Sequence, residues 1–539
     1  MWTRQTEASS GATTPAKEVV LPDLAPPSDD EAKGYYRRLP SCPRLVGRTS
    51  GKERWYSPFP GESSLPSSEE ISTIGQHTIV SLWEDLLESH VMTIIKDLPW
   101  TSVDVLRIGL KSVKRSDKPV IVWIGVSTAD IPWPKIADVL RAFRVVLDMR
   151  GLNDVDVEIR VATVSQAAGP ALLPANSLNM SQMDVYLRQL YTTAVGQSFA
   201  SAKSDRTQGS LGMYLWAARS GNSTELFALT CRHVALPDTK FPGNRPYRRC
   251  FQGQPANKMI IPATGSWEDW NGEAEILVEE CNKSLQSARQ DPNVEPVDIQ
   301  LAELLLRNAS GWKRTVDSLQ PIDNRVVGEV FFSPPIGKAY DSNKVNPGTF
   351  TRDWCLVRMD LSKFPGQQMP QNVVDLRHRD WTQMQMTRLL NPHPQSPHKF
   401  TFPEGGLLRL SGVIPMEDLC KPNMLDKNGE ECLLVGKRGS ASGLTFGTAN
   451  EIKSVVRVYR GLEDFMSREW LVVGFNKRNA FSKKGDSGSV IFDMHGRVGG
   501  LLVAGSLAGS STYDVTYAIP MAQLLADINE HMGYEVKMV

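Results

Sequence analysis

The stretch Lys484-Gly485-Asp486-Ser487-Gly488-Ser489-Val490-Ile491-Phe492 places a serine between two glycines, with an aspartate before it and an apolar run behind it. The run Val490-Ile491-Phe492 is typical of the start of a buried strand. Gly485 and Gly488 permit a tight turn that residues with a Cβ resist. Such a turn aims the N–H groups of Gly485 and Ser487 at one point beside the serine hydroxyl. The stretch therefore predicts a nucleophile next to an oxyanion hole, as acyl transfer requires.

A serine hydroxyl needs a general base, and the chain supplies a histidine and an aspartate in suitable settings. The apolar run that begins at Phe227 ends in His233, and Asp353 leads directly into the apolar run Trp354-Cys355-Leu356-Val357. Taken singly, Ser487 reads as a turn serine and His233 as a histidine at a strand end, but together with an aspartate they favour a triad. The residues alone leave the choice of aspartate open, because others lie between the histidine and the serine: Asp317, Asp323, Asp341 and Asp360.

In the order His, Asp, Ser, these segments resemble the chymotrypsin-like (trypsin-fold) serine peptidases, in particular the intracellular trypsin-like proteins of filamentous fungi. The resemblance covers about residues 209–528 and includes the strand 498–505 after the serine turn. It implies an all-β double six-stranded barrel. It also implies a catalytic triad of His233, Asp353 and Ser487, in which Asp353 is preferred because such an aspartate leads straight into an apolar strand. The N–H groups of Gly485 and Ser487 would then form the oxyanion hole.

The same resemblance, carried over by position, implies a substrate pocket. Its floor is Phe481, and its walls are Val503, Ala504, Gly505 and Val515. None of these residues is acidic, so we expect cleavage after a small or apolar residue and not after Lys or Arg.

One element of the secreted members of this family is missing from the sequence. No Ile-Val-Gly-Gly segment stands near residue 205, so we expect Asp486 to lack the new N-terminal amine that activates those zymogens. The site is then either formed from the outset or controlled by the region that precedes it.

Composition argues against several other classes of protein. The chain of 539 residues has a formal net charge of zero, which gives no electrostatic argument for nucleic acid or an anionic membrane. We find no apolar run long enough for a membrane span and no signal peptide at the N-terminus. The seven cysteines are scattered and odd in number, which favours a reducing, cytoplasmic location. Cysteine and histidine spacing indicates no metal site, and no nucleotide-binding loop is present, so we expect no cofactor.

The chain reads as several domains. Helical and strand patterns between residues 79 and 161 follow the order helix, strand, strand, helix, strand, which predicts a small α/β domain. Its role is unassigned, and a regulatory protein partner is expected there or at the helical insertion. The expected boundaries are a disordered leader at 1–70, the α/β domain at 71–165, a linker at 166–208 and the peptidase domain at 209–539, with a helical insertion at about 270–320.

The sequence thus predicts an intracellular serine endopeptidase that hydrolyses protein or peptide substrates through an acyl-enzyme and that also processes itself. The alternative is a catalytically silent trypsin-fold scaffold that acts in protein binding or regulation. A chaperone-peptidase of the high-temperature-requirement type is disfavoured, because we recognise no PDZ domain in the sequence.

Overall fold

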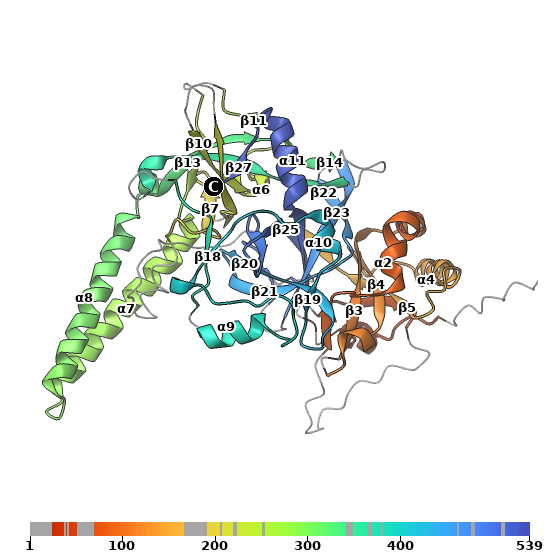
Figure 1. Cartoon of the computed structure of the whole chain (residues 1–539), viewed down its shortest axis with the longest axis horizontal. Helices are drawn as coiled ribbons and strands as arrows, with labels where there is room; N and C mark the ends of the chain where they lie inside the picture. Colours follow the sequence, from red (N-terminus) through yellow and green to blue (C-terminus); the bar gives the residue numbers. More distant parts are fainter. Residues whose placement is uncertain are drawn as a thin grey trace, which may run out of the picture.

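The computed structural model describes residues 24–36, 39, 42–50, 69–110, 112–166, 191–204, 207–218, 224–250, 254–340, 349–364, 369–378, 381–460, 463–475, 480–507 and 513–539. The protein is mostly β, with one half-barrel, one ring of six strands and additional helices (Figure 1). This architecture is compatible with the expected pair of barrels. Within the described ranges, no helix is both long enough and apolar enough to cross a membrane.

The half-barrel lies in a nine-stranded sheet with the strand order β27-β9-β10-β16-β13-β12-β7-β8. Because β27 pairs with β9, the C-terminal end of the chain returns to this first β unit. The strands of the sheet are β7 (Ser198–Ser201), β8 (Gly209–Ser210), β9 (Met213–Ala218), β10 (Thr224–Thr230), β11 (Tyr247–Arg248), β12 (Lys258–Ile260), β13 (Val326–Ser333), β16 (Cys355–Met359) and β27 (Lys537–Met538).

The position of β7 corrects the expected linker at 166–208. Strand β7 pairs with β12 and β8, and Phe199 is fully buried, so this end of the linker belongs to the first β unit. The sequence did not reveal it, because a strand of four residues has too few positions to show an alternation.

The ring of six strands forms the second β unit. Its order is β23-β21-β20-β24-β25-β26, and the pairing of β23 with β26 closes it. Helix α11 (Met521–Met532) follows the last strand and buries Leu524 and Ile528. One hydrophobic cluster includes side chains of both β units. The strands of the ring are β20 (Glu431–Gly439), β21 (Gly443–Ala449), β23 (Glu463–Gly474), β24 (Val490–Asp493), β25 (Val498–Leu507) and β26 (Val515–Pro520).

The expected helical insertion is present as two long antiparallel helices, α7 (Thr264–Gln290) and α8 (Pro296–Ser318). They project away from the β units as a hairpin (Figure 1). At the base of the hairpin the rings of Trp270 and Trp312 meet edge to face, with centroids 5.5 Å apart. Towards the tip, α8 exposes apolar side chains: Val297, Leu301, Leu304 and Leu305.

The region before residue 165 has the predicted element order. Helices α2 (Thr78–Leu82) and α3 (Glu88–Ile95), joined by a π-helical turn (Trp83–Leu87), precede β3 (Trp100–Leu110), β4 (Val120–Val126), α4 (Trp133–Asp148) and β5 (Val155–Val161). Strands β4 and β5 are parallel, as the intervening helix requires. We call residues 69–166 the N-terminal unit.

The expected disordered leader at 1–70 is wrong in part. Helix α1 (Asp29–Gly34) is followed by β1 (Leu45–Arg48), which pairs with β5, and by β2 (Glu69–Ser72), which pairs with β3. Tyr36 is buried, and its hydroxyl donates to the carboxylate of Glu158 at 2.5 Å. These elements are short and separated by Pro- and Ser-rich sequence, so no sustained apolar period revealed them. Residues 1–23, 37–38, 40–41 and 51–68 lie outside the described ranges.

The N-terminal unit and the ring share one sheet. Strand β22 (Ser454–Arg460) pairs with β23 on one side and with β3 on the other, at Val103↔Val455 and Ser102↔Val456. The result is a 14-stranded sheet that runs from β1 to β26. The two parts are therefore joined by backbone hydrogen bonds and not only by side-chain packing.

A buried polar cluster reinforces this junction. The guanidinium of Arg160 lies 3.3 Å from the Asp104 carboxylate and donates to Ser506 Oγ of β25 at 2.9 Å. The Tyr517 hydroxyl of β26 donates to Asp104 at 2.9 Å. The Arg160 guanidinium also lies 3.4 Å from the centroid of the Trp123 ring. Burial raises the pKa of Asp104, although Arg160 opposes the rise.

Shorter elements connect the larger ones. They are β6 (Thr163–Gln166), α6 (Arg232–Ala235), β14 (Gly337–Tyr340), β15 (Thr349–Arg352), β17 (Val373–Asp375), α9 (Gln383–Leu390), β18 (Leu407–Arg409), α10 (Met416–Cys420), β19 (Met424–Leu425) and the 3-10 helices Arg115–Asp117, Ile322–Arg325, Leu361–Lys363 and Glu404–Gly406.

Candidate active site

His233 and Asp353 come together at the ends of two paired strands. His233 lies on α6, directly after β10, and Asp353 stands just before β16. Because β10 and β16 are antiparallel, with Thr230 opposite Cys355, these two ends meet. Nδ1 of His233 lies 2.6 Å from Oδ2 of Asp353, and the His233 backbone N–H donates to Oδ1 at 3.1 Å. The carboxylate is fully buried and holds the ring in one orientation.

The structure selects Asp353 among the aspartates that the sequence left open. Asp317 pairs with Lys313 at 2.5 Å, Asp323 pairs with Lys258 at 2.8 Å, and the Asp360 side chain accepts from the Ser362 N–H at the start of a 3-10 helix. Asp341 lies outside the described ranges. Each of the three described alternatives is thus engaged elsewhere, whereas Asp353 contacts the histidine.

The turn that carries Ser487 has the glycine-dependent backbone that its sequence predicts. Gly485 has φ +108° and Gly488 has φ +90°, both in the left-handed region. A Cβ on Gly488 would lie 2.4 Å from the carbonyl oxygen of Ser210 and 2.4 Å from Oγ1 of Thr230. Only glycine fits there, and the turn is consequently pressed against the end of β10, immediately before His233.

Ser487 is fully buried, and its hydroxyl donates to the carbonyl of Val503 at 3.1 Å. Nε2 of His233 is buried, and no described residue is its hydrogen-bond partner. In the structure, His233 therefore contacts Asp353 directly. The Ser487 turn packs against the end of β10, and the serine hydroxyl donates to a backbone carbonyl of β25.

Asp486, at the centre of this turn, is held by a buried lysine. Nζ of Lys437, on β20, lies 3.4 Å from Oδ2 of Asp486, and both side chains are fully buried. The carboxylate also accepts from the backbone N–H groups of Ala441, Ser442 and Lys483 at 3.0, 3.1 and 2.8 Å, and from the Ser442 hydroxyl at 2.5 Å. The ammonium of Lys437 thus lies next to Asp486, for which the sequence predicted no N-terminal amine as a partner.

Lys437 was not among the residues predicted from the sequence. Burial lowers the pKa of its ammonium below the ordinary 10.5, while the neighbouring Asp486 acts in the opposite direction. Its ammonium also donates to the Ser442 hydroxyl and to the carbonyl of Gly443 at 3.1 Å. The position of Lys437 directly after the apolar run 432–435 and Gly436 in β20 was the available signal for a buried ammonium that needs a partner.

The predicted pocket residues come from the segment before the serine turn and from strands β25 and β26. Phe481, Val503, Ala504 and Val515 are all buried. Val503 contacts Ser487 directly, and Phe481 lies near Lys437, with its ring centroid 5.9 Å from Nζ. A Cβ on Gly505 would lie 2.3 Å from Cγ of Tyr513, so the tyrosine ring covers this glycine. The sequence did not single out Tyr513.

Cys231 brings a third potential metal ligand close to His233 and Asp353, with the ligand atoms within 4.8 Å of one another. Burial raises the pKa of the Cys231 thiol well above its ordinary value. The thiol donates to the carbonyl of Leu502 at 3.3 Å, and Nδ1 of His233 is taken up by Asp353. A protonated thiol is a poor ligand, because metals bind the thiolate, so these groups fit a hydrogen-bonded pair better than a metal centre.

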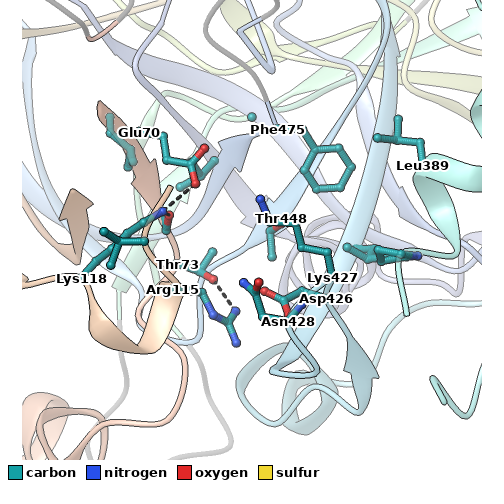
Figure 2. Close-up of a pocket in the computed structure, with 17 residues that line it drawn as sticks. Glu70, Thr73, Arg115, Lys118, Leu389, Asp426, Lys427, Asn428, Thr448 and Phe475 are labelled. Atoms are coloured by element: carbon teal, nitrogen blue, oxygen red, sulfur yellow. Dashed lines mark hydrogen bonds and ion pairs between the residues drawn. The ribbon is translucent and has the colours of Figure 1, made fainter. Parts of the chain in front are cut away.

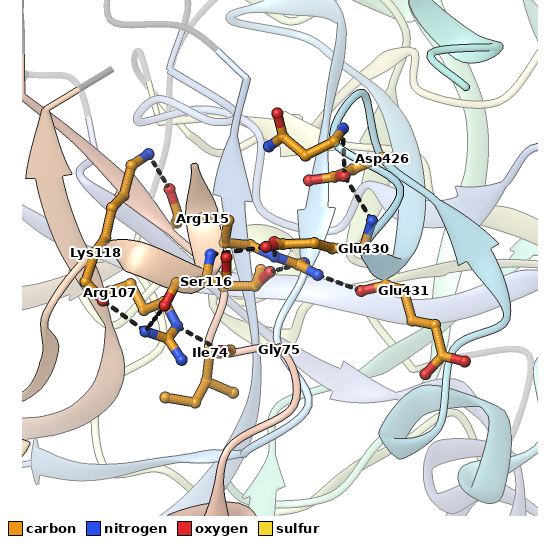
Figure 3. Close-up of polar contacts among 12 residues, drawn as sticks. Ile74, Gly75, Arg107, Arg115, Ser116, Lys118, Asp426, Glu430 and Glu431 are labelled. Carbon is orange, nitrogen blue, oxygen red and sulfur yellow. Dashed lines mark hydrogen bonds and ion pairs between the residues drawn. The ribbon is translucent and has the colours of Figure 1, made fainter. Parts of the chain in front are cut away.

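A separate cavity of about 350 Å³ lies where β2 and the 3-10 helix Arg115–Asp117 meet the ring (Figure 2). Three of its charged lining residues form ion pairs: Lys118 with Glu70 at 2.6 Å, and Arg115 with Glu430 at 2.6 Å. Arg115 also donates to the carbonyl of Glu431, across the junction drawn in Figure 3. None of the predicted site residues lines this cavity, and the contacts of Arg115 with Glu430 and Glu431 join the N-terminal unit to the ring.

Comparison with known proteins adds no relative. No protein-family model matches the chain, and no curated protein matches it.

Proposed function

We propose that this chain is a serine endopeptidase with a divergent chymotrypsin-like double β-barrel. The observation that carries the proposal is the buried contact between His233 and Asp353 beside a glycine-dependent turn that presents Ser487. The half-barrel and the ring of six strands support the double-barrel reading, because His233 and Asp353 come from the first β unit and Ser487 from the second. Because the residues of this site come from two β units, the site forms only when both units are folded.

In the proposed mechanism Ser487 Oγ attacks the carbonyl carbon of a peptide bond, and Nε2 of His233 takes the serine proton. Asp353 holds the ring and stabilises the imidazolium. The N–H groups of Gly485 and Ser487 bind the oxyanion of the tetrahedral intermediate. His233 then protonates the leaving amine, and water hydrolyses the acyl-enzyme by the reverse sequence of proton transfers. The substrate is a protein or peptide whose residue at the acyl position is small or apolar.

The state of the cysteines supports work in a reducing, intracellular compartment. All seven are thiols and not disulfides, and Cys231 and Cys355 are buried. A disulfide framework of the kind used by small secreted domains contributes nothing to this fold.

A second candidate is the silent scaffold, in which the same barrels bind a protein without cutting it. One observation favours it: the Ser487 hydroxyl donates to the Val503 carbonyl, while Nε2 of His233 has no described hydrogen-bond partner. Catalysis requires the Ser487 hydroxyl to donate to Nε2 of His233 in place of the Val503 carbonyl.

A fluorophosphonate probe distinguishes the two candidates, because it reacts with a serine only when a base and an oxyanion hole activate it. We expect intact mass analysis of the full chain to show one label on Ser487, and Ser487→Ala and His233→Ala to show none. The control is Ser506→Ala, which removes a buried hydroxyl of β25 that has no proposed role in the chemistry. Unlabelled wild-type protein with a cooperative unfolding transition would favour the scaffold.

A further inference from the structure

Asp527 is a buried carboxylate on the C-terminal helix α11. Its neighbours on the same face of the helix, Leu524 and Ile528, are apolar and fully buried, and Asp527 itself is only 5% exposed. Burying a carboxylate among apolar side chains costs free energy unless the charge is paired and hydrogen-bonded. An aspartate at this position is therefore expected to have specific partners.

The partners of Asp527 are the two residues on either side of Asp353. The guanidinium of Arg352 pairs with both carboxylate oxygens, because Nη2 donates to Oδ1 at 2.6 Å and Nε donates to Oδ2 at 2.9 Å. The indole Nε1 of Trp354 donates to Oδ2 at 2.7 Å. Asp527 thus holds the chain immediately before and immediately after the candidate catalytic aspartate.

The contacts of these three consecutive residues alternate, as they do in an extended chain, where successive side chains point in opposite directions. The side chains of Arg352 and Trp354 reach α11. Between them, the carboxylate of Asp353 reaches Nδ1 of His233 at 2.6 Å. Fixing the first and the third residue therefore limits how far the carboxylate of the middle residue can move away from the imidazole.

Helix α11 connects the two β units at this point. The helix follows β26 and packs against β25 and β26 of the ring, and the Ser487 turn leads into β24 of the same ring. Asp353 instead leads into β16 of the first β unit. Asp527 therefore links the unit that supplies the serine to the segment that supplies the aspartate, and the distance between the two depends in part on this link.

We propose that Asp527 is a positioning residue of the active site, which holds Asp353 against His233. It does so by fixing Arg352 and Trp354 from the second β unit. The inference rests on the proposed function, in which Asp353 orients the imidazole of His233. Asp527 supplies no proton and forms no bond in the reaction, and its whole effect passes through the segment that carries Asp353.

Asp527→Asn tests this assignment with little change in side-chain shape. The amide has one acceptor oxygen in place of two, so it cannot hold Arg352 and Trp354 together. The Arg352 side chain is 22% exposed, so water can solvate its guanidinium and the variant should fold. We expect the maximal rate of fluorophosphonate labelling of Ser487 to fall by roughly 10- to 100-fold, as small misplacements of reacting groups cause. The probe concentration that gives half of the maximal rate should not change.

A nuclear magnetic resonance spectrum gives a readout that a loss of stability alone would not move. In protein with 15N-labelled histidine, the proton between Nδ1 of His233 and Asp353 should give a downfield signal in the wild type. The signal should shift or broaden in Asp527→Asn, at a urea concentration where the variant is folded. Arg352→Gln should act in the same direction. The double variant should be labelled no more slowly than Asp527→Asn, because both changes break one contact.

The matched control is Asp375→Asn. Asp375 is another buried carboxylate that pairs with an arginine through both oxygens, with Nε of Arg377 at 2.9 Å and Nη2 at 2.7 Å. It lies on β17, in the separate two-stranded sheet of β17 and β18. Asp375→Asn should be labelled on Ser487 at the wild-type rate and should keep the His233 signal.

The outcomes separate the positioning role from the proposed function. If the wild type is labelled, and Asp527→Asn is labelled equally fast and keeps the His233 signal, the positioning role is wrong and the peptidase proposal stands. Equal slowing by Asp375→Asn would also overturn the positioning role. An unlabelled wild-type chain overturns the peptidase proposal. The His233 signal then decides the positioning of Asp353 by itself: a signal displaced in Asp527→Asn supports it, and an unchanged signal overturns it.

Discussion

Replacing Lys437 by methionine tests how the serine turn is held. Methionine keeps most of the volume of the buried side chain and removes its ammonium. At the observed 3.4 Å between Nζ and Asp486 Oδ2, the two charges attract by about 5 kcal/mol at an effective dielectric constant of about 20. Dehydration of the buried ammonium outweighs this attraction, since the pKa of Lys437 lies below its ordinary value, but removing one member of a buried pair still typically costs about 3–5 kcal/mol because it leaves the other charge without its partner.

The cost should lie near the lower end of that range. After the substitution, Asp486 keeps three backbone N–H donors and the Ser442 hydroxyl. We therefore expect the free energy of unfolding to fall by about 3 kcal/mol, which still leaves a folded protein. Since Asp486 stands between the two oxyanion donors, a shifted carboxylate displaces at least one of them, and fluorophosphonate labelling should slow roughly 100-fold.

The lowered pKa of Lys437 predicts the direction in which the free energy of unfolding changes with pH. Burial lowers the pKa of Lys437 in the folded protein below its ordinary 10.5. Between the lowered value and 10.5 the unfolded chain binds more protons than the folded chain, so the free energy of unfolding rises with pH in that window. Lys437→Met lacks this rise, and the stability gap to wild type should widen as the pH approaches 10.5.

Urea unfolding at several pH values and labelling kinetics measure both effects. The matched control is Lys283→Met, which removes the same group from an exposed pair with Glu279 on α7 and should leave the stability of the protein unchanged. The double variant Lys437→Met/Asp486→Asn should recover stability, because it leaves no buried charge. The reasoning is refuted if Lys437→Met matches the wild type in both stability and labelling rate.

Two further substitutions probe the site and the junction. Asp353→Asn should slow labelling of Ser487 by about 10³–10⁴-fold, since the amide favours the wrong tautomer of His233, while circular dichroism stays unchanged; a normal rate would contradict the triad. Arg160→Met should lower the free energy of unfolding by about 3–5 kcal/mol, because it strands the buried Asp104 carboxylate. Urea titration measures this loss, and unchanged stability in Arg160→Met would show that the cluster does not hold the junction.

Local patterns predicted the parts of the site that local sequence determines. Gly485 and Gly488 predicted a turn with positive φ. The apolar runs predicted the strand that ends before His233 and the strand that begins after Asp353. Long periodic stretches likewise predicted α7 and α8, because a helix repeats its signal over many turns. In each case the information lies within one short segment.

What the sequence concealed depends on partners that are distant along the chain. Nothing near Lys437 indicates that its ammonium faces Asp486, because the strand reads the same whichever way that side chain points. Strands β1, β6 and β7 are four residues each, too short for an alternation to stand out. These strands form because they pair with the edges of other strands, and that pairing depends on the assembled sheet.

The shared sheet has a consequence for how the chain gains and loses structure. Because β3 continues the ladder of β22, unfolding the N-terminal unit alone would bare a row of backbone N–H and C=O groups along β22. Amide hydrogens of β3 and β22 should then exchange with solvent in one cooperative opening and not as two independent ones. A shortened chain that starts at residue 209 would carry that bared edge permanently and invite association with other chains. The N-terminal unit is thus an integral part of the fold and not an independent domain that can be removed.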